Sequence, residues 1–238
     1  MNVIFPMLGI GSQEKLAGYP ISLYEIHKKT ILERVIENYK SLGAKFIFII
    51  GEKEEKKYHL SSISNTISKT SGEIITVKRP TSGALCTCLL AIDYLNDDEE
   101  LLIANTDQLF TEPFSKIFSA ISKNASSAVF SFNSVHPRWS YSFSNGDIVQ
   151  SIREKDPYTR QALAGVTYFR KSQYFKQAAM SSLLKERSLD SIYYVAPSIN
   201  ELILKGHFVQ NIFLNENVFI PLYSSSLIMD YERKLTYN

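Results

Sequence analysis

The sequence has few cysteines, little net charge and no long hydrophobic run. Its cysteines, Cys86 and Cys88, have no others to pair with, which excludes a disulfide framework and fits a reducing cytoplasm. The net charge of +2, from 26 basic and 24 acidic residues, argues against nucleic acid as the main partner, because a phosphate backbone requires a basic face. We expect no signal peptide, because the apolar start lacks a basic leader, and no membrane span, because that needs roughly 20 apolar residues.

What the sequence does have is the length and composition of one globular domain. Hydrophobic residues make up 45% of its 238 residues and charged residues 21%. Folds of the α/β class often form a single unit of about 200–250 residues. No internal repeat and no linker rich in proline, glycine or serine divides the chain. We therefore expect one domain over residues 1–238.

The apolar pattern predicts an α/β fold. In the first half, expected strands at 2–7, 45–50, 73–77 and 100–104 alternate with expected helices at 30–42, 52–64 and 81–95. This alternation implies β-α-β units and a mainly parallel sheet, with the loops that follow each strand at one edge. The second half has shorter strands, which predicts a mixed β arrangement there. They are expected at 128–133, 140–144, 149–154, 165–170 and 209–214, with helices at 174–185 and 196–205.

Three polar segments follow strands, where open α/β sheets bind their ligands. The first is the loop at 8–15, which contains Gly9 and Gly11. Glycines let a backbone approach a phosphate closely, and exposed amides can cradle it. A plain turn between a strand and a loop explains this pattern equally well.

The other two segments offer a site for a base and a site for a metal ion. Thr81, Ser82 and Gly83 begin a helix, where small side chains leave room for a flat base and amides attract anions. Alternatively, Thr81 or Ser82 caps this helix. Asn105 and Asp107 end a strand, and a lone carboxylate can hold Mg²⁺ when phosphates supply the other ligands. The alternative there is a turn stabilised by a side chain.

Nine stretches, in the same order, resemble the sugar-phosphate nucleotidyltransferases of the GT-A-like fold. More narrowly, they resemble a capsule-biosynthesis branch that is also classed with family 2 glycosyltransferases. The resemblance implies a three-layer α/β/α domain with a mainly parallel central sheet, in which 1–110 bind the nucleotide and 111–238 bind the acceptor. The stretches are PMLGIGS at 6–12, AGY at 17–19, ILERVIENY at 31–39, PTSGALCTCLLA at 80–91, LLIANTDQ at 101–108, HPRWSY at 136–141, EK at 154–155, GVTYFR at 165–170 and YYVAPSINELI at 193–203.

The resemblance implies a Mg²⁺-dependent enzyme that transfers NMP from an NTP to a sugar phosphate, or a similar phosphate monoester, for surface or capsular polysaccharide. CTP, UTP and dTTP all remain open, and so does a homo-oligomer. Asp107 would bind the metal, and Lys15 and Lys155 would act with it in catalysis. Residues implied to bind the nucleotide are Leu8, Gly9, Gly11, Ser12, Gln13, Thr81, Ser82, Gly83 and Asn105. Those implied to bind the acceptor are Arg138, Trp139, Glu154, Lys155 and Gly165.

The chain departs from the family pattern at positions that carry positive charge. An Arg that grips the triphosphate in relatives is Gln13 here, and a Lys that contacts the transferred phosphate is Ile21. Each such electrostatic contact can be worth about 10²–10³ in rate. Lys15 lies nearby and could replace the Arg charge, but not its bidentate geometry. For a second metal carboxylate, the sequence offers only Asp230 as a weak candidate.

These departures keep two other functions open. One is a glycosyltransferase with a nucleotide-sugar donor, in which Asn105-Thr106-Asp107 acts as a reduced D-x-D metal motif. The other is a non-catalytic nucleotide-binding relative, suggested by the two lost cations. Arg138-Trp139 is expected to line the acceptor site by charge or stacking, with a surface loop as the alternative. Tyr193 and Tyr194 are expected to pack in the core.

Overall fold

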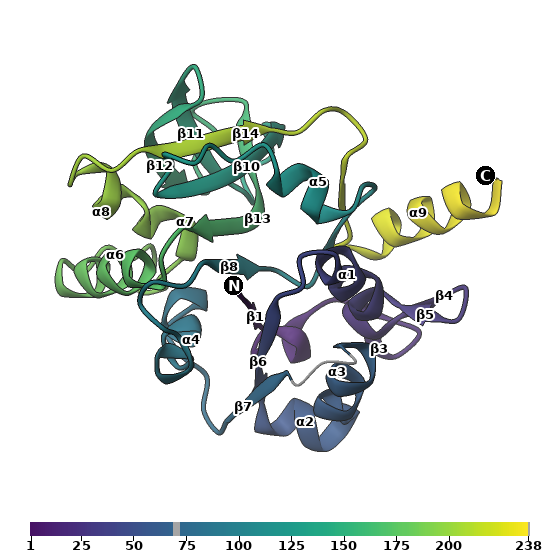
Figure 1. Ribbon diagram of the computed structural model, residues 1–238. Helices are drawn as coiled ribbons and strands as arrows, with labels where there is room; N and C mark the ends of the chain where they lie inside the picture. The colour runs from purple at the N-terminus through teal and green to yellow at the C-terminus, as the bar shows by residue number, and fades with distance from the viewer. Residues whose placement is uncertain (69–71, 238) are drawn as a thin grey trace.

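The computed structural model describes residues 1–68 and 72–237, and it has a mixed α/β fold (Figure 1). The strands are β1 (Asn2–Pro6), β2 (Lys15–Leu16), β3 (Tyr19–Pro20), β4 (Glu25–Ile26), β5 (Lys29–Thr30), β6 (Lys45–Gly51), β7 (Glu73–Val77), β8 (Leu101–Ala104), β9 (Gln108–Phe110), β10 (Ser127–Asn133), β11 (Ser140–Asn145), β12 (Ile148–Glu154), β13 (Gln161–Phe169), β14 (Val209–Phe213) and β15 (Phe219–Pro221). The helices are α1 (Ile31–Lys40), α2 (Glu52–Tyr58), α3 (Leu60–Ser68), α4 (Ala84–Leu89), α5 (Phe114–Phe118), α6 (Ser172–Leu184), α7 (Val195–Ser198), α8 (Asn200–Ile203) and α9 (Ser225–Tyr237), and the 3₁₀ turns are η1 (Ile10–Ser12), η2 (Ile21–Leu23) and η3 (Ile92–Tyr94).

One nine-stranded sheet organises the molecule, in the order β10-β14-β12-β11-β13-β8-β1-β6-β7. Strands β8, β1, β6 and β7 pair in parallel, as the alternation of strands and helices in the first half predicts. β13 joins β8 in the antiparallel sense. The first half therefore has the parallel pairing that was expected, and β13 begins the mixed half.

The strands of the second half form a closed ring of pairings. Strand β10 pairs with β14 in parallel and also with β13 in the antiparallel sense. Strands β10, β14, β12, β11 and β13 therefore form a ring, which lies above β8 in Figure 1. The mixed β arrangement predicted for this half is confirmed.

Both faces of the inner parallel strands β1, β6 and β8 are buried. On β1, Val3 and Phe5 belong to one apolar cluster and Ile4 belongs to the other, as the alternation of side chains along a strand requires. The first cluster includes residues of α1 and α3, and the second includes residues of α4 and α6. Burial on both faces explains why these strands read as continuous apolar runs.

Helix α1 illustrates how local sequence positions an element. Thr30 caps it by accepting a hydrogen bond from the Glu33 amide at 3.1 Å. Ile31, Val35 and Ile36 are buried at helical spacing against the sheet. Within residues 1–68 and 72–237, no helix has the length and apolarity that crossing a bilayer requires.

Several expected boundaries are wrong. The helix expected at 81–95 is α4 followed by η3, and the helix expected at 196–205 is the two short helices α7 and α8. The sequence reading also missed α9, which projects from the body of the molecule in Figure 1, and the short pairing of β9 with β15.

Candidate active site

The loop after β1 leaves a stretch of backbone open to solvent. Gly9 is exposed, and a Cβ atom built on it would meet nothing within 4 Å. The hydroxyl of Ser12 donates to the Gly9 carbonyl at 2.8 Å, which closes the turn η1. Leu8 precedes Gly9 and is half-buried. The loop therefore has the accessible backbone that a phosphate site requires.

Gln13 and Ile21, where the family resemblance implies cations, have neutral side chains held within the protein. The Gln13 side-chain oxygen accepts hydrogen bonds from the Ser22 hydroxyl at 2.6 Å and from the Ser22 amide at 3.2 Å. The side chain of Ile21 is 1% exposed and packs in the core. Lys15 is exposed on the β2–β3 hairpin. Gln13 and Ile21 therefore supply no positive charge to the Gly9 loop.

Asp107 lies at the same edge of the sheet as Gly9. A cavity of about 250 Å³, here called the loop cavity, is lined by Gly9, Gln13, Asn105 and Asp107, among others. Burial raises the pKa of the Asp107 carboxyl, and the charge of Arg138 opposes this shift. The loop that could hold a phosphate and the carboxylate that could hold its metal ion therefore share one cavity.

A second cavity brings the expected acceptor residues together. This central cavity, of about 290 Å³, shares Asn105 and Asp107 with the loop cavity. Its other walls include Arg138, Trp139, Glu154 and Gly165, together with Ser140, Tyr194 and Ala84. Segments far apart in sequence thus line one continuous depression beside Asp107.

The guanidinium of Arg138 lies against two aromatic rings, which meet each other edge to face. Its guanidinium carbon lies 3.0 Å from the ring centroid of Tyr223 and 4.9 Å from that of Trp139. Such stacking stabilises a cation. Among the described residues that line the central cavity, Arg138 carries the positive charge. Sequence reasoning missed Tyr223, because nothing in the segment at 220–224 indicates that it packs on a residue so distant in sequence.

Glu154 and Lys155, adjacent in sequence, face different surroundings. The Ser140 hydroxyl donates to the Glu154 carboxylate from the neighbouring strand. Burial raises the pKa of Glu154, and this hydrogen bond opposes the shift. Lys155 has a left-handed backbone with φ of 54°, and its ammonium lies 5.5 Å from the ring centroid of Tyr194. Tyr194 also raises the pKa of Lys155 through a hydrogen bond.

Gly165 is a position where only glycine fits. Its φ is +65°, and a Cβ atom there would lie 2.6 Å from the Asn105 side-chain nitrogen and closer still to the Gln108 side-chain oxygen. The backbone amide of Asn105 also donates a hydrogen bond to the Gly165 carbonyl at 3.1 Å. The absence of a side chain at Gly165 therefore leaves room for the side chains of Asn105, which lines the central cavity, and Gln108.

The segment expected to flank a base is fixed to a neighbouring loop. The Thr81 hydroxyl donates to the Gly83 carbonyl at 3.0 Å, and the Ser82 carbonyl accepts from the Tyr193 amide at 2.8 Å. The N-cap of α4 is Gly83, without any side-chain capping bond, so the alternative that Thr81 or Ser82 caps this helix is wrong. Tyr193 packs in the core as expected, whereas Tyr194 lines the central cavity, so that part of the expectation is wrong.

The donor set suits magnesium better than a tightly bound transition metal. Among the described residues, no group of three or more His, Cys, Asp or Glu side chains could hold an ion. Asp107 and Glu154 nevertheless line one cavity, and Mg²⁺ usually takes one or two carboxylates with waters and substrate phosphates. Asp230 lies on α9, bonds to Arg233 and lines a different cavity, away from Asp107.

Comparison with known proteins places the fold. No protein-family model and no curated protein sequence matches the chain. The chain is similar to the crystal structure of a nucleoside-diphosphate-sugar pyrophosphorylase from Vibrio cholerae RC9, with a TM-score of 0.85 and 20% identity over 97% of this chain and 99% of that one. It is also similar to the inositol-1-phosphate CTP transferase from T. maritima, with a TM-score of 0.75 and 14% identity over 99% and 95% of the two chains.

A third solved structure, described as a glucose-1-phosphate thymidylyltransferase from Bacillus anthracis, has a TM-score of 0.74 and 13% identity over 98% of this chain and 94% of that one. At these identities the likeness shows the fold and not the activity. The chain therefore has the α/β fold of sugar nucleotidyltransferases.

Proposed function

We propose that the chain is a nucleotidyltransferase that transfers NMP from an NTP to a sugar phosphate or a similar phosphate monoester. The observation that carries this proposal is the shared wall of the two cavities. Asn105 and Asp107 border both the open backbone at Gly9 and the chamber that holds Arg138 and Glu154. A triphosphate over the loop and a phosphate acceptor in the chamber would then meet at Asp107.

The reaction needs positioning and charge neutralisation more than proton transfer. An oxygen of the acceptor phosphate, already ionised, attacks the α-phosphorus of the NTP. A new P–O bond forms, the bond between the α-phosphorus and its bridging oxygen breaks, and pyrophosphate leaves with the electron pair. Asp107 would hold a Mg²⁺ ion that neutralises the charge of the phosphates.

Arg138 and Glu154 have complementary roles in this proposal. Arg138, held by contacts with the Tyr223 and Trp139 rings, would present a positive charge to the acceptor phosphate in the central cavity. Glu154, oriented by Ser140, accepts hydrogen bonds from acceptor hydroxyls. Thr81, Ser82 and Gly83 would flank the base, which we propose to be the cytosine, uracil or thymine of CTP, UTP or dTTP.

The products of such a reaction serve as activated building blocks. We propose surface or capsular polysaccharide as their destination, on the resemblance of the nine sequence stretches. Lys15 and Lys155 remain proposed catalytic cations. Lys15 lies beside the loop, and Lys155 follows Glu154 directly, so either could approach a phosphate when substrates bind.

The direct test is pyrophosphate release with each NTP across a panel of sugar, polyol and amino-alcohol phosphates, in the presence of Mg²⁺. The account predicts release for one NTP and one acceptor class, and its loss in Asp107→Asn. Arg233→Gln is a matched control, because Arg233 lies on the distant α9. A folded protein that releases pyrophosphate in no combination contradicts the proposal.

A specific observation supports a second function, that of a nucleotide-binding relative without catalysis. Gln13 is bonded to Ser22 and Ile21 is buried, so two catalytic charges of the family pattern have no counterpart at their positions. Calorimetry separates the two functions. Tight NTP binding without pyrophosphate release favours this second function, and turnover that requires Asp107 excludes it.

A further inference from the structure

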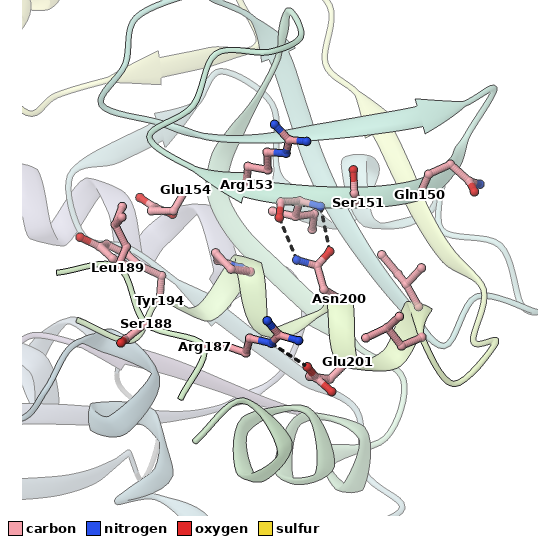
Figure 2. Close-up of a pocket in the computed structure, with 14 residues that line it drawn as sticks. Gln150, Ser151, Arg153, Glu154, Arg187, Ser188, Leu189, Tyr194, Asn200 and Glu201 are labelled. Carbon is pink, nitrogen blue, oxygen red and sulfur yellow. Dashed lines mark hydrogen bonds and ion pairs between the residues drawn. The ribbon is translucent and has the colours of Figure 1, made fainter. Parts of the chain in front are cut away.

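A third cavity adjoins the central cavity on the side away from Gly9. This outer cavity has a volume of about 510 Å³ and shares Glu154 and Tyr194 with the central cavity. It lies between β12 and helices α7 and α8 (Figure 2). Its volume falls within the range of small-molecule sites, about 300–1,000 Å³. The outer and central cavities share this wall, and the central and loop cavities share Asn105 and Asp107. A ligand that passes Glu154 and Tyr194 would reach from the central cavity into the outer one.

The floor of the outer cavity is fixed by a side chain that pairs with a strand. The side-chain oxygen of Asn200 accepts from the Ile152 amide at 2.8 Å, and its nitrogen donates to the Ile152 carbonyl at 2.8 Å. Figure 2 shows both bonds crossing from α8 to β12. Such two-sided pairing keeps the helix at a constant distance from the strand, so the cavity is a built feature of the fold.

A buried carboxylate orients a cation at this cavity. Glu201 is 3% exposed and accepts a hydrogen bond from Lys185 at 2.5 Å. The Arg187 side chain is 65% exposed, and its Nε lies 3.9 Å from the other Glu201 oxygen. Because Glu201 already has Lys185 as a close partner, Arg187 keeps hydrogen-bond donors for a ligand. Figure 2 shows Arg187 beside Glu201 below Asn200.

The other arginine of the cavity is engaged elsewhere. Arg153 forms an ion pair with Asp156 at 3.0 Å, and its guanidinium lies over the ring of Tyr158. In Figure 2 its side chain points away from Asn200. The remaining walls include exposed apolar side chains, Leu189 and Leu204. The outer cavity thus combines apolar walls with one available cation.

From this arrangement we infer that the acceptor is a phosphate monoester with a second anionic group at its far end. Its phosphate would lie in the central cavity, its body would pass Glu154 and Tyr194, and its terminal carboxylate or phosphate would bind Arg187. The inference rests on the proposed function, because it assigns the acceptor phosphate to the central cavity. It narrows the substrate class from any phosphate monoester to long, doubly anionic ones.

Three probes separate length from charge: 2-phosphoglycolate, octyl phosphate and 8-(phosphonooxy)octanoate. Calorimetry measures the dissociation constant of each probe for the full-length parent protein and for its Arg187→Gln and Arg153→Gln variants. We expect 8-(phosphonooxy)octanoate to bind the most tightly. Arg187→Gln should weaken that probe alone by about tenfold, as the loss of a charged hydrogen bond does. Arg153→Gln should change none of the three.

The outcomes distinguish this inference from the proposed function. If octyl phosphate binds as tightly as the long acid, or if both arginine variants act alike, the inference is wrong while the proposed function stands. If no probe and no NTP binds, both fail. Weaker binding of all three probes in Arg138→Gln, with Arg187→Gln selective for the long acid, supports both.

Discussion

Replacing Gly165 with alanine tests the construction of the site by a substitution of one methyl group. The left-handed backbone at φ of +65° costs a residue with a side chain about 1–2 kcal/mol. Crowding of the new Cβ against Asn105 and Gln108 adds about 1–3 kcal/mol, as overpacking does in a dense interior. We expect Gly165→Ala to lower the free energy of unfolding by about 2–5 kcal/mol.

Gly146 supplies the matched control. It has a similar φ of +59°, but a Cβ there would meet nothing within 4 Å. Gly146→Ala should therefore lower the free energy of unfolding only by the cost of the left-handed backbone, about 1–2 kcal/mol. Alanine also restricts the unfolded chain, but this stabilising effect is the same in both variants and cancels in the comparison. Urea denaturation measures the two values. Equal destabilisation in both variants would show that the contacts of Asn105 and Gln108 with Gly165 do not constrain the site.

Three further predictions concern charge in and near the site. Burial raises the pKa of Asp107 in the folded protein, so this carboxyl lowers stability as pH rises from its ordinary pKa to the raised one, and the loss is constant above that. In thermal unfolding, Asp107→Asn should be more stable than the parent at pH 8, with no difference near pH 3, where the carboxyl is protonated in the folded and the unfolded state. A gain in stability that does not depend on pH contradicts this. Ile21→Lys places an ammonium in the core and should lower stability in urea by about 3 kcal/mol or more, so it cannot restore activity; an unchanged stability would refute the burial of this side chain. Tyr223→Ala removes one of the rings that contact Arg138 and should raise the KM for the acceptor. Tyr223→Phe keeps the ring and should leave this KM unchanged. Equal effects of the two variants would mean that the ring contact does not contribute to acceptor binding.

The first half of the fold could be read from the sequence because buried parallel strands leave a strong signal. The strand expected at 73–77 is β7 at the same residues, and those at 45–50 and 100–104 differ from β6 and β8 by one residue at one end. Elements with weak or interrupted apolar patterns were not predicted. Strands β9 and β15 are three residues long each, so neither has a pattern long enough to recognise. Helix α9 has 13 residues but begins with serines and projects from the body (Figure 1), so its start carries no apolar signal.

The residues of the candidate site likewise fall into those that the sequence could indicate and those that it could not. Gly9, Asn105 and Asp107 could be found because each follows a strand of the parallel sheet, where topology brings loops together. Tyr223 and Tyr194 could not, because their positions depend on how the closed second half packs against the first. The left-handed conformation that makes Gly165 necessary is likewise a tertiary constraint.

The most direct test of the account is a crystal structure of the protein soaked with CTP, UTP or dTTP and Mn²⁺, a magnesium substitute visible by anomalous scattering. The account predicts a nucleotide with its phosphates over Gly9 and an anomalous peak within coordination distance of the Asp107 carboxylate. A nucleotide bound elsewhere, or a metal ion away from Asp107, would contradict it.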